Sequence, residues 1–171
     1  MLKFKKNHYT IEEVTLCGET VRFRAFRDLV YVEKPVNVEF QKMNLFVPES
    51  YYEGTSINGY DLLSAPVANP FLQGKPNTIF RALQHGYVVA SPAIRGRVQK
   101  GEDGHYNGKA PACVVDYKAA VRYLHFLADE LPGDENKIIT NGTSAGGALS
   151  SLMGSTGNHP DYEPLPRGHG V

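Results

Sequence analysis

The chain has 171 residues with 18 Lys and Arg against 18 Asp and Glu, so its formal net charge is zero, and 42% of its residues are hydrophobic. This length is enough for one domain with a single core, which would bury about 70% of the surface of the unfolded chain. A balanced charge argues against a nucleic-acid partner or a membrane-surface role, because both favour basic faces.

The N-terminus and the cysteines bear on the cellular location of the protein. The first eight residues are charged but contain no apolar stretch of the kind found in signal peptides, and no apolar run is long enough to span a bilayer. We therefore expect a cytoplasmic protein. Cys17 and Cys113 form no disulfide framework and no zinc-binding spacing, which favours buried structural thiols. No motif calls for a metal or an organic cofactor.

The first 50 residues have the pattern of β-strands. Val21, Phe23 and Ala25 alternate with arginines, as in a half-buried antiparallel strand. Residues 36–48 predict a further strand that ends at Pro48. Such a series of strands fits the antiparallel start of an α/β sheet and also fits an all-β module.

Helices and strands alternate after a loop-rich stretch at 50–76. Within that stretch, residues 62–68 predict a short strand. Residues 77–86 predict a helix that Asn77 or Thr78 caps, and residues 87–92 predict a buried parallel strand. This alternation favours an α/β fold over an all-β fold. His85 lies where a cation stabilises a helix C-terminus, so a capping role is favoured over catalysis.

The polar, glycine-rich segment 95–109 follows the carboxyl end of a predicted strand. Open α/β sheets bind their ligands at that edge, so Arg95, Arg97 or His105 are candidates for lining a substrate cleft. The alternative is a solvated loop with incidental charges, which we favour.

Residues 110–131 predict the longest helix, because apolar residues recur at intervals of three and four. Pro132 and Gly133 end it. Asp116 falls in its first turns and is interpreted as structural, since a carboxylate there compensates the helix dipole. His125 has aromatic neighbours and is assigned to packing.

Residues 137–153 carry the motif around which the chain is organised. Residues 138–140 predict a short buried strand, Gly142-x-Ser144-x-Gly146 follows directly, and a helix starts near Ala145. Strand, tight turn and helix form the context in which this motif presents a nucleophilic serine. Ser144 is therefore the predicted nucleophile, and the backbone amide of Ala145 is a predicted oxyanion-hole donor. The alternative is that Ser144 only caps the helix.

Residues 136–151 and 154–162 resemble the nucleophile region of bacterial tannase-like α/β-hydrolases. The likeness extends from about Phe40 to about Pro164. This family consists of serine carboxylesterases, some of which cleave galloyl esters. The resemblance implies a mostly parallel sheet wrapped by helices, with antiparallel N-terminal strands and a Ser, Asp, His triad in that order. It also implies a second oxyanion donor in the loop 68–74, which is shorter here than in the family, so we assign no residue to it.

The triad partners are missing from the residues that follow Ser144. A serine nucleophile needs a histidine base and a carboxylate that orients it. After Ser144, the histidines that could serve as the base are His159 and His169, and the carboxylates that could orient it are Asp161 and Glu163. His159 falls in a turn-like motif that the family also has, without a triad role.

We therefore interpret residues 1–171 as the N-terminal portion of a single α/β-hydrolase domain, truncated after the nucleophile helix. The downstream strands, the cap region, the triad acid and the base would be absent. The nucleophile strand would then lie at an exposed sheet edge, which invites self-association or pairing with a missing piece.

The sequence thus predicts a serine carboxylic-ester hydrolase of tannase-like type. It would act through an acyl-enzyme on Ser144 and take a small-molecule ester, with aromatic esters among the candidates. One alternative is a catalytically inactive fragment or a folding module that depends on a partner. Another is a peptidase or thioesterase of the same fold, because the motif does not distinguish an ester from an amide. No substrate-binding residue is identified.

Overall fold

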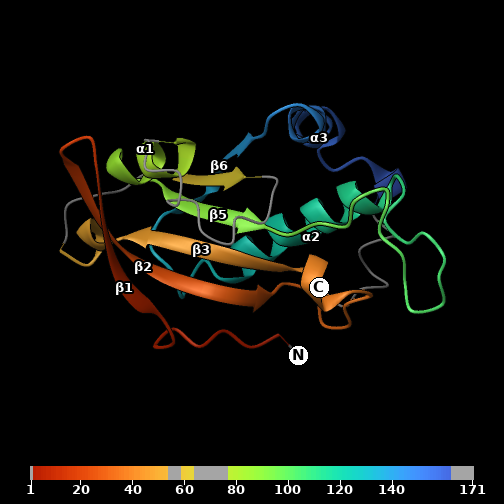
Figure 1. Ribbon diagram of the computed structural model, residues 1–171, viewed down its shortest axis with the longest axis horizontal. Coiled ribbons are helices and arrows are strands. Elements are labelled where there is room, and N and C mark those ends of the chain that lie inside the picture. The colour runs from red at the N-terminus through yellow and green to blue at the C-terminus, as the bar shows by residue number, and fades with distance from the viewer. Residues whose placement is uncertain (1, 54–58, 64–76, 163–171) are drawn as a thin grey trace.

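The computed structural model describes residues 2–53, 59–63 and 77–162 (Figure 1). Six strands of these residues form one sheet in the order β1-β2-β3-β5-β4-β6. The strands are β1 (Thr10–Leu16), β2 (Glu19–Val30), β3 (Lys42–Pro48), β4 (Gly59–Leu63), β5 (Val88–Pro92) and β6 (Asp134–Asn141). The α-helices are α1 (Thr78–Gln84), α2 (Ala112–Phe126) and α3 (Ala145–Thr156), and the 3-10 helices are η1 (Val38–Phe40), η2 (Glu49–Tyr51) and η3 (Pro160–Tyr162).

The sheet has an antiparallel half and a parallel half, as the sequence predicts. β1, β2, β3 and β5 pair antiparallel in succession, whereas β4 pairs parallel with both β5 and β6. The parallel half holds the alternation of helices and strands that begins at residue 77. The carboxyl ends of β5, β4 and β6 therefore meet at one edge of the sheet.

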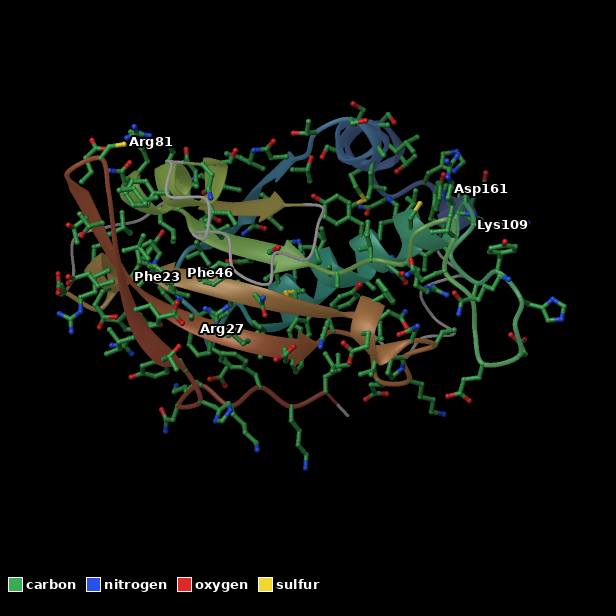
Figure 2. All side chains as sticks on the ribbon, viewed as in Figure 1. Phe23, Arg27, Phe46, Arg81, Lys109 and Asp161 are labelled. Carbon is green, nitrogen blue, oxygen red and sulfur yellow. The ribbon has the colours of Figure 1, made fainter. Side chains whose placement is uncertain are left out.

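Side chains alternate between two hydrophobic cores, one on each face of the sheet. In β3, Leu45 packs toward α2, whereas Phe46 packs toward α1; in β5, Val88 and Val89 divide in the same way. This is the two-residue period of a strand that is covered on both faces. On the α1 face, Phe46 meets Phe23 edge to face, with 5.6 Å between ring centroids (Figure 2).

Helix α1 forms as its sequence predicts. The side-chain Oδ1 of Asn77 accepts a hydrogen bond of 3.0 Å from the backbone N–H of Phe80, which satisfies one of the free amides of the first turn. Ile79, Ala82 and Leu83 are buried against the sheet. His85 occupies the C-cap position and is exposed, in the place the capping interpretation requires.

The strand predicted over residues 36–48 is wrong in its first half. Asn37 caps the 3-10 turn η1 by accepting from the N–H of Glu39 at 3.0 Å, and Gln41 in turn accepts from the N–H of Asn37 at 3.0 Å. These local bonds compete with strand pairing, so β3 begins only at Lys42. Of the strand predicted at 62–68, the first two residues belong to β4, and the others lie outside the described residues.

The prediction of a buried nucleophile strand is also wrong. Within the described residues β6 pairs only with β4, so it has a sheet neighbour on one side. Ile138 packs against the core on the α2 face, whereas Ile139 points to the opposite face and is 49% exposed. Within the described residues the apolar run therefore marks an edge strand.

Two further burial predictions fail. Cys17 is exposed because it lies in the turn between β1 and β2, where its backbone has a positive φ of 53°. Cys113 is only partly buried near the start of α2. His125, assigned to packing, is exposed because it lies on the solvent side of the last turn of α2.

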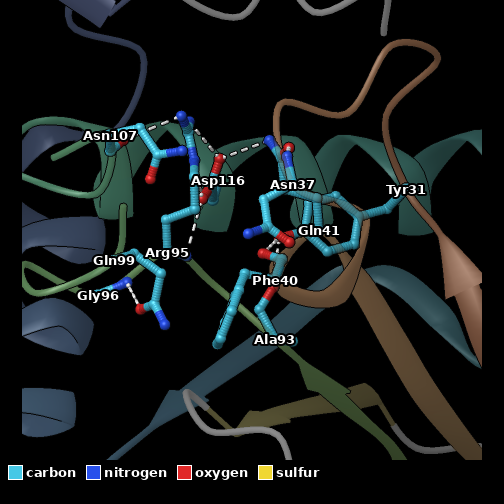
Figure 3. A network of polar contacts seen from close by, with 10 residues as sticks. All are labelled: Tyr31, Asn37, Phe40, Gln41, Ala93, Arg95, Gly96, Gln99, Asn107 and Asp116. Atoms are coloured by element: carbon cyan, nitrogen blue, oxygen red, sulfur yellow. Dashed lines mark hydrogen bonds and ion pairs between the residues drawn. The ribbon is translucent and has the colours of Figure 1, made fainter. Parts of the chain in front are cut away.

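A buried ion pair joins α2 to the end of β5 (Figure 3). The Asp116 carboxylate accepts from Arg95 through Nε at 2.8 Å, Nη2 at 2.8 Å and the backbone N–H at 2.9 Å. Gln41 Nε2 donates to the same carboxylate at 3.0 Å. Asp116 is therefore structural, as predicted, but it acts as an acceptor of four hydrogen bonds rather than through the helix dipole.

This ion pair corrects both interpretations of Arg95. The side chain neither lines a cleft nor lies in a solvated loop, because Arg95 is 5% exposed and its Nη1 also donates to the Asn107 carbonyl at 3.1 Å. Beside it, burial and then the Asp116 charge raise the pKa of Tyr31 well above its usual value. The Tyr31 hydroxyl therefore remains a donor, and it donates to the Ala93 carbonyl at 2.6 Å.

We expect Asp116→Ala to lower the free energy of unfolding by about 3–5 kcal/mol, because it leaves the Arg95 guanidinium buried without its partner. Urea denaturation followed by circular dichroism measures this change. The matched control is Asp161→Ala, which removes an exposed carboxylate and should change stability by less than about 0.5 kcal/mol. Equal effects of the two substitutions would contradict the assigned role of the pair.

Candidate active site

Ser144 lies in the sharp turn between β6 and α3. Its backbone has φ 56° and ψ −119°, a conformation that residues with a side chain rarely adopt. Strain of this kind costs about 1–3 kcal/mol and is concentrated at functional sites. The turn follows the carboxyl end of a parallel strand, where open α/β sheets bind ligands.

The Ser144 side chain does not have the contact that the capping alternative requires. Ser144 occupies the N-cap position of α3, but its hydroxyl makes no capping hydrogen bond. The residue is exposed. Within the described residues, the turn therefore presents a hydroxyl without a capping bond to solvent at the edge of the sheet.

Small residues make this turn possible. The N–H of Gly146 donates to the Thr143 carbonyl at 3.0 Å, which closes the turn tightly. A Cβ added to Gly147 would stand 3.1 Å from the Gly142 carbonyl oxygen, closer than most Cβ contacts in proteins. Gly147 is thus the position where the lack of a side chain permits the first turn of α3 to approach the end of β6.

The Ala145 amide is available to an anion. Within the described residues no acceptor is found for its N–H, whereas the amides of Gly146 and Ala148 donate to Thr143 and Ser144. Ala145 is exposed and is the first residue of α3. The positive end of the helix dipole and a free N–H therefore meet beside the Ser144 hydroxyl.

The candidate triad residues after Ser144 are not brought to it. His159 follows the far end of α3, whose 12 residues extend for about 18 Å along the helix axis. There it is exposed, and its Nδ1 lies 3.5 Å from Asp161 Oδ2. His169 and Glu163 lie outside the described residues, as does the loop 68–74.

The other histidines of the described residues lie on other elements of the chain. His85 follows α1 and precedes β5, so it lies at the amino edge of the parallel strands, opposite the edge that carries Ser144. His105 is exposed on the loop after β5, and His125 is exposed on the last turn of α2. Among the described residues, no group of three or more His, Cys, Asp or Glu side chains could bind a metal.

Sequence reasoning missed Lys118. It lies on α2, is only 6% exposed and donates from Nζ to the carbonyl of Gly157 at the end of α3. Only the structure shows what sets this residue apart. Lys118 lies within a run of buried positions from Val114 to Ala120, where a lysine is unusual.

A strained serine between a parallel strand and a helix N-terminus, on a sheet whose first strands are antiparallel, defines the α/β-hydrolase class. Comparison with known families agrees. A sequence profile of the BD-FAE family matches residues 71–165, which is more than half of the chain, and the protein belongs to this family.

The chain is also similar to solved structures of tannases and to a curated esterase. It is 40% identical to the tannase of Fusobacterium nucleatum, with a TM-score of 0.92, over 99% of this chain and 39% of that one. It is 36% identical to a tannase from Lactobacillus plantarum, with a TM-score of 0.88, over 98% of this chain and 39% of that one. Esterase LipC of Mycobacterium tuberculosis is 36% identical over 91 residues, which are 52% of this chain and 23% of LipC.

The chain thus spans about two fifths of the length of the tannases it matches. The fold of the described part is that of tannase-like α/β-hydrolases. Among the described residues, no helix is long and apolar enough to cross a membrane.

We expect Gly147→Ala and Gly154→Ala to have opposite effects, although both replace a glycine of α3. A Cβ at Gly154 meets no atom within 4 Å, so the substitution should stabilise the protein by about 0.5–1 kcal/mol. At Gly147 the Cβ meets a backbone carbonyl, so this variant should be about 1–3 kcal/mol less stable than Gly154→Ala. Urea denaturation measures both, and equal stabilities would show that the turn is not tightly packed.

Proposed function

We propose that the chain carries the nucleophile of a serine carboxylic-ester hydrolase of tannase-like type. The observation on which the proposal rests is the backbone strain at Ser144, which holds an exposed hydroxyl beside the first amides of α3. A hydroxyl that served only packing or capping would need neither the strain nor the exposure. Membership of the BD-FAE family supports the same activity.

The proposed reaction proceeds through an acyl-enzyme. Ser144 Oγ attacks the ester carbonyl carbon while its proton passes to a base, and the carbonyl oxygen becomes an oxyanion. The Ala145 N–H donates to this oxyanion, with the dipole of α3 behind it. The intermediate then collapses, the C–O bond to the alcohol breaks, and the alcohol leaves with the proton from the base. Water hydrolyses the acyl-Ser144 ester in the second half of the reaction.

We assign the base and its carboxylate to polypeptide outside the described residues. The placement of His85 at the opposite edge of the parallel strands and of His159 beyond the far end of α3 supports this assignment. The share of the tannases that the chain covers is in keeping with residues 1–171 being the N-terminal portion of one α/β-hydrolase domain. The second oxyanion donor belongs to the same proposal and has no residue assigned.

The proposed substrate is a small ester with an aromatic acyl group. One of the matched structures is a tannin acyl hydrolase in complex with ethyl gallate, and another is in complex with 3,4-dihydroxybenzoate. The same nucleophile geometry would serve a thioesterase or a peptidase. The names of the relatives favour an oxygen ester over these alternatives.

We expect Ser144→Ala to abolish covalent labelling of the chain by a fluorophosphonate probe, because the probe reacts with an activated serine. Intact mass spectrometry would measure the labelling, and turnover of p-nitrophenyl acetate would be followed in parallel. Ser155→Ala is the matched control, since Ser155 is exposed on the same helix and its Oγ donates only to the Leu152 carbonyl at 3.3 Å. The control should be labelled as fast as the wild type.

The two readouts separate the alternatives. Labelling at Ser144 with little turnover would support a nucleophile whose relay lies elsewhere. Rapid turnover that depends on Ser144 would overturn the assignment of the base outside the described residues. No labelling of the wild type would favour an inactive fragment or a partner-dependent folding module.

We further propose that the outer edge of β6 pairs with another strand, either of a second copy or of a separate polypeptide. Its backbone groups on that side have no strand partner within the described residues. Beside it, Ile139 lines an apolar hollow of about 240 Å³ together with residues of α1 and of the turn between α1 and β5. An unpaired edge next to exposed apolar surface is a template for strand addition.

We expect self-association of the chain in sedimentation-velocity experiments, and Ile139→Lys should raise the dimer dissociation constant by roughly tenfold, or about 1.4 kcal/mol. Ile11→Lys is the matched control, because Ile11 is also 49% exposed but lies on β1 at the opposite edge of the sheet. A chain that stays monomeric at all concentrations, or an effect confined to Ile11→Lys, would refute pairing through β6 between copies.

A further inference from the structure

Helix α3, which carries Ser144 at its N-terminus, is weakly anchored by its own side chains. Leu149 is its one buried residue, whereas α2 has nine. Most of the other side chains of α3 are Gly, Ala and Ser, which remove little apolar surface from water. Apolar packing alone therefore fixes this helix poorly, and its orientation requires a further contact.

Lys118 supplies a polar contact at the far end of α3. Its Nζ donates to the carbonyl of Gly157, the C-cap residue, and lies 5.1 Å from the centroid of the Tyr162 ring. The ammonium group therefore meets the negative end of the helix dipole and the face of an aromatic ring. Within the described residues Lys118 forms no ion pair with a carboxylate.

Burying the charged Lys118 side chain costs free energy. Burial, and then the nearby charge of Arg122, lower the pKa of Lys118 below its ordinary value, so the environment disfavours the charged form. An apolar residue at this position would avoid that cost. The benefit is the contact with the end of α3, which an apolar side chain does not make.

We propose that Lys118 is a positioning residue for Ser144, acting by holding the C-terminal end of α3 against α2. This inference rests on the proposed function. A helix is a stiff rod, so fixing its last turn fixes the direction of its first turn, about 18 Å away along the helix axis. The N-terminal turn holds both the nucleophile and the Ala145 amide, whose aim at the oxyanion depends on that direction.

The test compares Lys118→Met, which keeps most of the unbranched side chain but removes the charged group, with Lys118→Arg, which keeps the charge. The control is Arg122→Met, which removes a cation from the same helix; among the described residues, Arg122 makes no hydrogen bond or ion pair. Hydrogen exchange measured by mass spectrometry reports on the amides of α3. Fluorophosphonate labelling yields the maximal inactivation rate and the probe's binding constant separately.

We expect Lys118→Met to raise hydrogen exchange in the last two turns of α3 by at least about tenfold, while exchange in β3 and β5 stays unchanged. The maximal inactivation rate should fall between about 10- and 100-fold with an unchanged binding constant, because a displacement near 1 Å suffices for such a loss. Lys118→Arg should recover most of the rate, and Arg122→Met should match the wild type.

Several outcomes would overturn the proposal. A rate loss in Lys118→Met equal to that in Arg122→Met would do so, as would faster exchange throughout the sheet, which indicates general destabilisation. If Lys118→Met fails to fold, Tyr162→Leu removes the ring contact with Lys118 while it keeps an apolar side chain against the core, and it should give a smaller change of the same kind. No change would refute the clamp. If the wild type is not labelled, the proposed function fails, and the exchange data still decide whether Lys118 holds α3.

Discussion

Helix α2 is buried along one long stretch between the sheet and α3, and this burial constrains the two charged residues that lie within the stretch. From Val114 to Ala120 each residue is buried, including Asp116 and Lys118. An unpaired charge in such a place costs several kcal/mol, so each of the two needs partners. Asp116 finds them in Arg95 and Gln41, and Lys118 finds them at the end of α3.

These two charges connect α2 to different parts of the molecule. Through Asp116 the helix holds the exit of β5 and the segment that leads into β3, and through Lys118 it holds the helix that carries Ser144. The polar contacts lie in a core that is otherwise apolar. They therefore contribute directionality, which nonspecific hydrophobic packing provides only weakly.

How far the sequence predicts this structure depends on whether the signal is local. Asn77 caps α1, the arginines of β2 alternate with buried residues, and the turn at Ser144 has its small neighbours, all because short-range geometry dictates them. Where a partner distant in the sequence determines whether a side chain is buried, the local sequence gives the wrong prediction. Arg95 has the composition of a solvated loop around it, yet a carboxylate 21 positions away draws it inside. Lys118 gives no sequence signal for the same reason.

The burial of β6 is a second property that the local sequence does not determine. Two consecutive isoleucines predict a strand covered on both faces, but coverage is a property of the neighbours and not of the strand. Within the described residues β6 has one neighbour, and Ile139 remains half exposed. A fold class can thus be correct while the burial of an individual strand is not.

The strained backbone at Ser144 is present even though β6 lies at an edge of the sheet in the described residues. The conformation must therefore be held by what surrounds it here: the closed turn between Thr143 and Gly146, and the close approach of Gly147 to Gly142. It follows that presenting the hydroxyl and activating it are separable tasks in this fold. Presentation is local to strand, turn and helix, whereas activation requires a base, which we assign to polypeptide outside the described residues. A chain built in this way should keep the orientation of the Ser144 hydroxyl, the proposed nucleophile, under conditions in which that hydroxyl is unreactive.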